Sequence, residues 1–283
     1  MRTSSPWHRP ETGDTWIMGV LNCTPDSFSD GGLFTDKKRA VSHAISMYGA
    51  GAAIIDVGGE STRPGSKSIP LEVELHRVLP VIEALVSAGV YVSVDTSKSE
   101  VMRRALGAGA RMVNDVTALT GDSNSMAVVA ESSCDVCLMH MRGTPEKMQD
   151  DPHYDDVVAE IETFFQQRLE ACVQAGVCES RIILDPGIGF GKSLQDNLMI
   201  LASLYRFKKL GFPVLAGVSR KSFLAELTAS PASDREIETA AAVTACVLAE
   251  VDILRVHEVL CQARVVKVAS AFHRTLSKQS KVS

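Results

Sequence analysis

Eight short apolar runs, rich in β-branched residues, recur along the chain, and each predicts a β-strand. They cover residues 16–21, 52–58, 90–95, 111–116, 135–140, 181–186, 213–219 and 251–257. Within these runs apolar residues follow one another with few polar interruptions, which is typical of parallel strands buried on both faces. The hydrophobic pattern therefore predicts a buried, parallel set of strands.

Amphipathic helical patterns separate these runs. In residues 36–52, Ala40, Ile45 and Met47 recur with a period near 3.6. The same pattern is found in residues 72–89, 99–110 and 154–176. Strand and helix thus alternate eight times, which predicts a single (β/α)8 TIM barrel with its active site at the C-terminal ends of the strands. The alternative is an open doubly wound sheet, which eight such units rarely build.

No stretch rich in Pro, Gly or Ser divides the chain, so we expect one barrel over residues 16–276. Residues 1–15 would then form an N-terminal extension. Residues 277–283 form a short polar tail that we expect to be disordered.

Composition narrows the class of protein. The chain has 283 residues, a formal net charge of −5 and 45% hydrophobic residues, as ordinary soluble proteins do. Mild acidity gives no general attraction to nucleic acid or to an anionic membrane. No apolar run reaches the roughly 18 residues that span a bilayer, and the N-terminus lacks an apolar signal core. The seven cysteines are an odd number, and without a signal core we expect a reducing compartment, so a disulfide framework is not expected. We therefore expect a cytoplasmic protein without a disulfide framework.

Each predicted strand ends in polar or ionisable residues. They are Asn22, Glu60 to Arg63, Asp95, Asn114 and Asp115, His140, Asp185, Ser219 to Lys221, and Arg255 and His257. In a barrel of this kind, all these ends meet at one rim, where the chemistry takes place. The alternative is that strand ends are polar because they meet solvent, which explains single members better than the whole set.

These residues fall into two chemical groups. Carboxylates and an amide, at Asp95, Asn114 and Asp185, suit a flat heterocycle with an amidine-like edge, such as a 2-amino-4-oxo pyrimidine ring. Cationic or imidazole side chains suit phosphate or diphosphate. They are Arg63, Arg220, Lys221, Arg255 and His257. The sequence therefore predicts a site with an acceptor half and a cationic half.

Two stretches resemble motifs of other kinds of site, a nucleotide-binding loop and a redox cysteine pair, but neither fits its motif. The stretch "PGIGFGKS" (186–193) has Pro186 where a phosphate-binding P-loop needs its first Gly, and Lys192 where a dinucleotide motif needs its third. We expect its glycines to let the backbone approach a ligand, with Phe190 available for stacking. In "CDVC", Cys134 and Cys137 would face opposite sides of a strand, so we interpret both as packing residues.

Eight segments together resemble the dihydropteroate synthase family. They are "IMGVLNCTPDSFSDGG", "IIDVGGESTRPG", "SVDTSK", "VNDV", "LMHMRGTPEKMQ", "ILDPGIGFGK", "GVSRKSFL" and "LRVHEV", and they lie between residues 17 and 259. The resemblance implies a transferase of folate biosynthesis. It would join 4-aminobenzoate to (7,8-dihydropterin-6-yl)methyl diphosphate, release diphosphate and 7,8-dihydropteroate, and be a target of sulfonamides.

The resemblance also implies roles for individual residues. For the pterin they are Asp95, Asn114, Met139, Asp185, Phe190, Lys221 and Arg255. For the diphosphate they are Asn22, Arg63, Arg255 and His257, with Asn22 also a ligand of a Mg²⁺ cofactor. For the aminobenzoate they are Phe28, Thr62, Pro64, Phe190, Lys221 and Ser222. The residues expected to act in catalysis are Asn22, Asp30, Lys221 and Arg255.

A mechanism follows from the same resemblance. Diphosphate leaves before the arylamine attacks, and the cation left on the pterin methylene must be protected from water. We therefore expect the loops 23–34 and 61–70 to close over the ligands, with Asp30 facing the cation.

The expected partners are the two small-molecule substrates, with no nucleic acid and no membrane. The family is commonly dimeric, and apolar residues in 257–276 could pair two subunits, although burial against the barrel explains them equally well. Two rival functions stay open: a pterin-dependent methyltransferase barrel and a non-catalytic pterin-binding barrel. The chain departs from the family's usual residues at Cys23, Ile188 and Glu258, none of which has an assigned chemical role.

Overall fold

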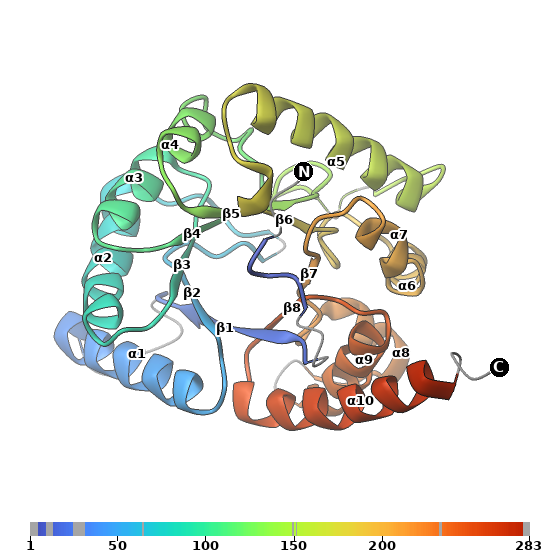
Figure 1. Cartoon of the computed structure of the whole chain (residues 1–283). Coiled ribbons are helices and arrows are strands. Elements are labelled where there is room, and N and C mark those ends of the chain that lie inside the picture. Colours follow the sequence, from blue (N-terminus) through green and yellow to red (C-terminus); the bar gives the residue numbers. More distant parts are fainter. Residues whose placement is uncertain are drawn as a thin grey trace.

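The computed structural model describes residues 5–9, 14–24, 32–63, 65–148, 150, 152–231 and 234–279, with the side chains of residues 32–36 excepted. Its centre is a barrel of eight parallel strands ringed by helices (Figure 1). The strands are β1 (Trp16–Asn22), β2 (Ile54–Gly58), β3 (Val92–Asp95), β4 (Met112–Asp115), β5 (Asp135–Met139), β6 (Ile182–Asp185), β7 (Leu215–Ala216) and β8 (Ile253–Val256). All eight predicted strands are present, and the predicted (β/α)8 barrel is confirmed.

The strands pair in the order β6-β5-β4-β3-β2-β1-β8-β7. A parallel bridge between Leu184 and Val214 brings β6 against the residue before β7 and closes the ring. β7 has only two residues, although the sequence predicted a strand over 213–219. Pro213 has no N–H to donate, and Gly217 offers no side chain to pack, so regular pairing is confined to the residues between them.

Helices follow the strands in the predicted alternation. They are α1 (Gly32–Gly49), α2 (Leu71–Ser87), α3 (Ser99–Gly107), α4 (Ser125–Glu131), α5 (Val157–Gln174), α6 (Leu194–Ala202), α7 (Leu204–Lys208), α8 (Ser222–Thr228), α9 (Glu236–Leu248) and α10 (Val259–Gln279), with a short 3₁₀ helix at Glu179–Arg181. α10 therefore includes the first residues of the predicted tail, while residues 280–283 lie outside the described residues. None of the helices described is long and apolar enough to cross a membrane.

Helix α1 differs from its predicted pattern in one residue. Ala40 and Met47 are buried, as expected, but Ile45 is 40% exposed and Ala44 is buried instead. The buried stripe follows the spacing i, i+4, i+7, which places position 44 and not 45 against the barrel.

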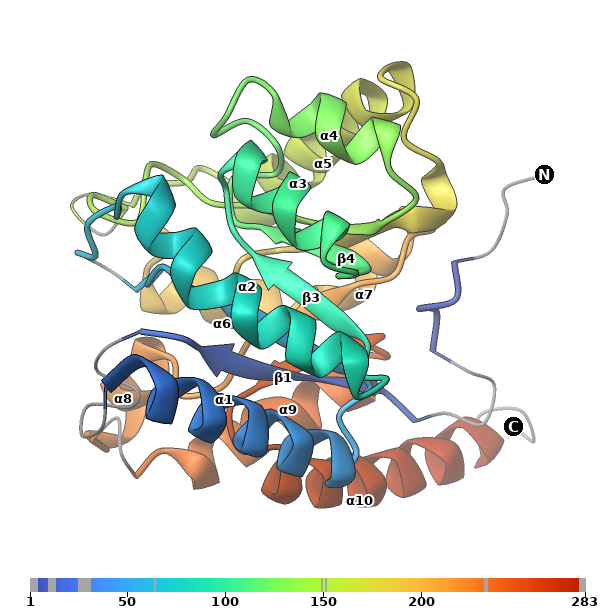
Figure 2. The same ribbon diagram turned by 90° about the vertical axis from the view of Figure 1, so that its left-hand side faces the viewer.

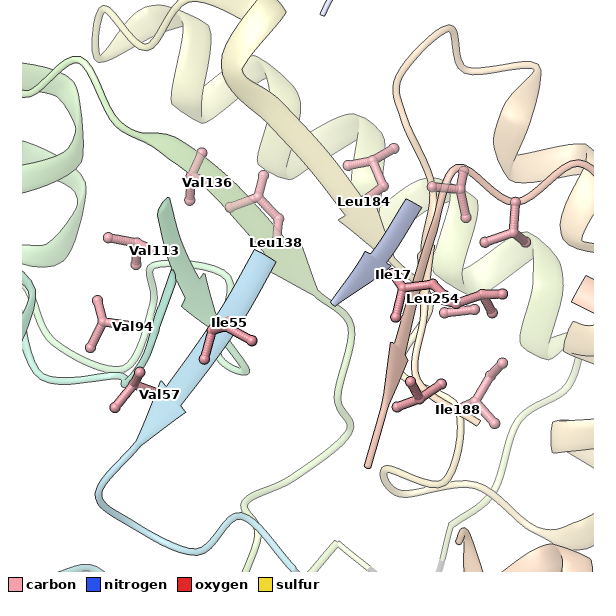
Figure 3. Packing of buried hydrophobic residues seen from close by; sticks show 14 of the residues in the cluster. Ile17, Ile55, Val57, Val94, Val113, Val136, Leu138, Leu184, Ile188 and Leu254 are labelled. Atoms are coloured by element: carbon pink, nitrogen blue, oxygen red, sulfur yellow. The ribbon is translucent and has the colours of Figure 1, made fainter. Parts of the chain in front are cut away.

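Two apolar layers hold the barrel together. The outer layer lies between strands and helices and includes Ile55, Val94 and Leu184, which Figure 3 shows among its buried neighbours. The inner layer fills the barrel itself, and its buried members on the strands are Met18, Ile54, Met112, Cys137, Ile183, Leu215 and Ile253. Cys134 belongs to the outer layer and Cys137 to the inner one, so both are packing residues, as predicted.

The N-terminal segment closes the barrel at the end opposite to the strand tips. Trp7 packs edge-on against Trp16 and Tyr91, with ring centroids 6.0 and 5.0 Å apart, and its Nε1 donates to Oδ2 of Asp135 at 2.7 Å. In Figure 2 the arrow of β1 points away from this segment. The described part of the predicted extension 1–15 thus serves as a plug, and the opposite rim stays available for a site.

Candidate active site

The alternation of side chains along each strand builds the site. Successive strand residues face opposite sides, so a residue two positions beyond an inner-layer residue also faces the barrel interior. Moving two positions toward the C-terminal ends leads from apolar residues to polar ones, from Ile54 to Asp56, Met112 to Asn114, Ile183 to Asp185 and Ile253 to Arg255. The residue after Ser93 on the same face is Asp95, and Asn22 shares the face of Met18. The strands thereby carry a polar layer directly above an apolar floor.

Arg255 is the centre of the acidic half of this layer. Its Nε donates to Oδ2 of Asp56 and its Nη2 to Oδ2 of Asp95, each at 2.7 Å. Nδ2 of Asn114 donates to the same Asp56 oxygen at 2.9 Å. The other oxygens of these two carboxylates, Asp56 Oδ1 and Asp95 Oδ1, are buried and accept no hydrogen bond from the described residues. Two carboxylate acceptors are therefore left for donors from beyond the described residues.

Burial controls the charges in this half. Removal from water raises the pKa of Asp95, while the Arg255 guanidinium acts to lower it. Burial alone would lower the pKa of Arg255, but the carboxylates of Asp56 and Asp95 outweigh it and raise that pKa. Arg255 is therefore a permanent cation within a group of desolvated acids.

Asp185 joins the acidic half to Lys221. Oδ1 of Asp185 accepts a hydrogen bond from the backbone N–H of Gly187 at 2.8 Å, and burial raises its pKa. Lys221 Nζ lies 4.0 Å from the centroid of the Phe190 ring, within range of a cation–π interaction. Burial lowers the pKa of Lys221 to about 7, against the opposing attraction of Asp185. A Cβ at Gly189 would lie 2.9 Å from the Lys221 side chain, so the glycine makes this approach possible.

The cationic half surrounds His257. Its Nδ1 lies 3.0 Å from Oγ of Ser219. Its pKa is lowered to about 3, first by burial and then by the four cations near it. These cations are Arg255, Arg220, Lys221 and Arg63. His257 is thus a neutral imidazole in a positive environment, where an anion would be favoured.

Three of the polar strand ends have their polar or aromatic groups in contact with other parts of the protein. His140 follows the inward-facing Met139 and packs edge-on against Phe164, at 4.9 Å between ring centroids. Asp115 faces outward and accepts hydrogen bonds from the backbone of the turn at 117–119. The third is Arg220, whose guanidinium is paired with Glu236 at 2.7 Å and Glu258 at 2.9 Å, while its charge still acts on His257. That Arg220 belongs to the cationic set for a ligand stays a prediction.

The remaining predicted residues lie around the rim. Met139 is buried in the barrel interior, and Asn22 is half-buried at the tip of β1. Thr62 and Arg63 lie in the loop after β2, half-buried and exposed respectively, and Ser222 is exposed at the start of α8. Phe28, Asp30 and Pro64, together with residues 25–31 of the first predicted lid loop, lie outside the described residues.

Sequence reasoning missed Asp56, which is fully buried and bonded to both Arg255 and Asn114. A signal was present, because a lone carboxylate interrupts the apolar run "AAIIDVG". The carboxylate lies within the strand, two residues before its end, so the polar residues at strand ends do not include it. An acid inside an apolar strand has to be paired or functional, and here it is paired.

Comparisons with known proteins identify the family. Residues 18–257 match the model of the family described as pterin binding enzyme. Dihydropteroate synthase of Escherichia coli K12 is 44% identical over 256 residues, which are 90% of each chain. The structure of Xanthomonas albilineans dihydropteroate synthase with 4-aminobenzoic acid is 45% identical, with a TM-score of 0.86 over 92% of this chain and 94% of that one. The Yersinia pestis enzyme, solved as a sulfonamide drug complex, is 40% identical, with a TM-score of 0.89 over 97% of this chain and 100% of that one. This chain therefore belongs to the dihydropteroate synthase family of pterin binding enzymes.

Proposed function

We propose that the chain is a transferase that joins 4-aminobenzoate to (7,8-dihydropterin-6-yl)methyl diphosphate and releases diphosphate and 7,8-dihydropteroate. The observation that carries this proposal is the two-part site at the rim of the barrel. One part offers buried carboxylate oxygens without a donor among the described residues. In the other part, positively charged side chains lie around the neutral imidazole of His257. A pterin with a diphosphate arm has complementary groups, N–H donors at one end and an anion at the other.

The pterin would lie in the acidic half. Asp185, Asn114 and the open oxygens of the Asp56 and Asp95 pairs can accept its ring N–H groups, because charge-assisted hydrogen bonds of this kind are strong in a dry site. Arg255 would pack along the face of the ring. The walls of the pocket are assigned to Met139 and Phe190, with Lys221 at the edge.

The diphosphate would lie in the cationic half, against Arg63, Arg255 and His257. Mg²⁺ belongs to this proposal, with the Asn22 amide oxygen as its protein ligand. Among the described residues no group of three His, Cys, Asp or Glu could hold a metal. An amide oxygen is the right class of ligand for Mg²⁺, which often relies on one or two protein groups and on substrate phosphates for the rest. When bound, the metal would neutralise charge that develops on the leaving diphosphate.

The residues around the site favour departure of diphosphate before attack. Arg63, Arg255 and the neutral His257 stabilise the leaving anion. The arylamine nitrogen is already nucleophilic, so the chain needs no strong general base, and the low pKa of His257 makes that residue a donor and not a base at neutral pH. The aminobenzoate is assigned to Thr62, Ser222 and Lys221, with Phe28, Phe190 and Pro64 closing over it. Asp30 on the first loop would face the cation while both loops exclude water.

A single assay separates this function from its rivals. Diphosphate release from the pterin substrate is measured with and without 4-aminobenzoate, and we expect turnover that requires both substrates and falls in excess chelator. A pterin-dependent methyltransferase would bind the pterin without releasing diphosphate in response to the arylamine. A non-catalytic pterin-binding barrel would show binding and no turnover. Sulfonamides are expected to compete with the arylamine.

We further propose a cytoplasmic homodimer. Along α10, Val268, Phe272 and Leu276 are 58%, 63% and 57% exposed, and their spacing of four residues places them on one face of the helix. An apolar helix face of this kind fits pairing with a second subunit. All seven cysteines are free thiols, which agrees with a reducing compartment.

A further inference from the structure

Lys192 is buried beneath the glycine-rich loop 186–191, and the reaction proposed above gives it no task. Its side chain belongs to the motif that resembles a P-loop, but the residue is only 3% exposed. Acceptors surround its Nζ: the carbonyl oxygens of Gly187 and Phe190, each at 2.9 Å, the carbonyl oxygen of His140 at 3.2 Å, and Nδ1 of His140 at 3.1 Å. Lys192 therefore lies inside the loop and bonds to its backbone.

The environment of this ammonium group is unusual. Burial lowers the pKa of Lys192 to about 7, although Asp185 acts to raise it. Burial and the nearby positive charge of Lys192 lower the pKa of His140 to about 2, so its imidazole is neutral and its Nδ1 can accept. Taking an ammonium out of water is costly unless hydrogen bonds replace its hydration. Here the carbonyl oxygens of the loop accept these hydrogen bonds. The position of the loop backbone therefore depends on the position of the Lys192 Nζ.

The loop around Lys192 carries Phe190, which is assigned to both substrates, and contacts Asp185, which is assigned to the pterin. The N–H of Gly187 donates to Asp185, and the N–H of Phe190 donates to the Gly187 carbonyl at 3.1 Å. The Phe190 ring in turn lies under Lys221. A displacement of the Gly187 and Phe190 carbonyls would therefore move the groups that border the pterin and the aminobenzoate.

Close packing leaves the loop little freedom to relax without Lys192. A Cβ at Gly187 would lie 1.9 Å from the His140 carbonyl oxygen, and one at Gly191 would lie 2.6 Å from the Arg142 carbonyl oxygen. Helix α6 holds the opposite side of the loop, because Oδ1 of Asn197 accepts from the N–H of Gly189 at 2.6 Å. The loop is thus fixed between Lys192 and Asn197.

We propose that Lys192 is a positioning residue for the transferase reaction: its buried Nζ, through its hydrogen bonds, holds the loop 186–191 in the shape that presents Asp185 and Phe190 to the substrates. The identity of those substrates rests on the proposed function, whereas the control of loop shape does not. A residue that only stabilised the fold would leave this geometry unchanged once the protein had folded.

The test compares Lys192→Met with the matched control Lys209→Met, which removes an exposed lysine from α7's end. Amide hydrogen exchange of the free protein reports on residues 187–191, and steady-state kinetics report on KM and kcat. We expect faster exchange in this loop with protection kept in β5 and β6. For kinetics we expect kcat/KM for 4-aminobenzoate to fall by roughly 10- to 100-fold, mostly through KM, since small displacements of positioning groups have effects of this size.

The proposal is overturned if Lys192→Met lowers the unfolding midpoint but leaves both loop exchange and KM at their wild-type values. Lys192→Gln keeps a donor without the charge, and it carries the same readouts should the Met variant fail to fold. If the wild-type protein releases no diphosphate, the proposed function fails, while the exchange experiment still decides whether Lys192 controls the loop.

Discussion

Arg255 shows at the scale of a single residue how this site differs from an ordinary core. A guanidinium can serve two carboxylates at once because its donors point in fixed, divergent directions. Asp56 and Asp95 each use one oxygen on it and keep the other buried and open. Burying a charge in this way adds little to stability. It does prepare two acceptors in a fixed place, which is what recognition of a heterocycle requires.

Replacing Arg255 should destabilise the folded protein, because the buried carboxylates of Asp56 and Asp95 would lose their cation. In Arg255→Met, two buried carboxylates lose their partner, and we expect the free energy of unfolding to fall by about 3–5 kcal/mol near neutral pH. The pKa of Asp95 in the folded protein, already raised by burial, would then lie further above its unfolded value, so protonation of Asp95 restores stability as the pH falls through that pKa. Urea unfolding at about pH 8 and about pH 5.5 should show the smaller deficit at the lower pH. Arg103→Met, at an exposed pair with Glu100, is the control, and an equal deficit at both pH values would contradict this account.

Deprotonation of Lys221 should lower kcat/KM at alkaline pH. Its pKa of about 7 in the free protein means that it loses its charge as the pH rises through neutrality. The pH profile of kcat/KM reports the free enzyme, so this ratio for the pterin diphosphate should decline above that pKa. In Lys221→Arg the guanidinium stays protonated, and the decline should move to higher pH. An alkaline limb that is the same in both proteins would assign it to another group.

At the scale of strands and loops, the sequence allows much of the fold to be predicted but less of the site. The eight apolar runs locate every strand because a parallel barrel buries both faces of its strands. Strand ends alone do not say which way a side chain points. Asn114 and Asp115 are neighbours in sequence, yet only Asn114 faces the interior. Asp56 lies two residues before the end of β2, so a reading of strand ends does not find it. The contacts of Lys192 with His140 depend on packing between segments that are distant in sequence, which no local pattern records.

The loop after β6 should be sensitive to a single methyl group. In Gly187→Ala, the new Cβ would meet the His140 carbonyl oxygen at 1.9 Å, in a backbone with a φ of 66°. Gly176 has a φ of 93° but open space around its Cβ, so Gly176→Ala has the backbone strain without the clash. We expect a loss of about 1 kcal/mol for Gly176→Ala and clearly more, above about 3 kcal/mol, for Gly187→Ala. Similar losses in chemical denaturation of the two variants would argue against a tightly closed loop.

The whole molecule separates stability from activity along the barrel axis. The plug around Trp7 lies at the N-terminal ends of the strands, and the polar layer lies at their C-terminal ends. The ribbon in Figure 2 shows the N-terminal segment at the end of the barrel from which the arrow of β1 points away. This division is typical of TIM barrels, in which loops at one end vary with function. The inner apolar layer lies between the two ends.

Removing the plug should therefore affect stability alone. Trp7 is 8% exposed, and Trp7→Ala leaves a cavity beside Trp16 and Tyr91. We expect the free energy of unfolding to fall by about 3–5 kcal/mol while kcat and KM stay within about twofold of wild type under folding conditions. A large change in KM with intact folding would show that the two ends of the barrel are coupled.

Formation of 7,8-dihydropteroate and binding of the pterin should be measured side by side in the wild-type protein and in Asp185→Asn. In the wild type we expect product from (7,8-dihydropterin-6-yl)methyl diphosphate and 4-aminobenzoate. In Asp185→Asn we expect loss of calorimetric pterin affinity with an unchanged fold, because the variant loses a buried charged acceptor. Unchanged pterin affinity in that variant would contradict the assignment of the pterin pocket, and a wild-type protein that forms no product from the two substrates would contradict the proposed reaction.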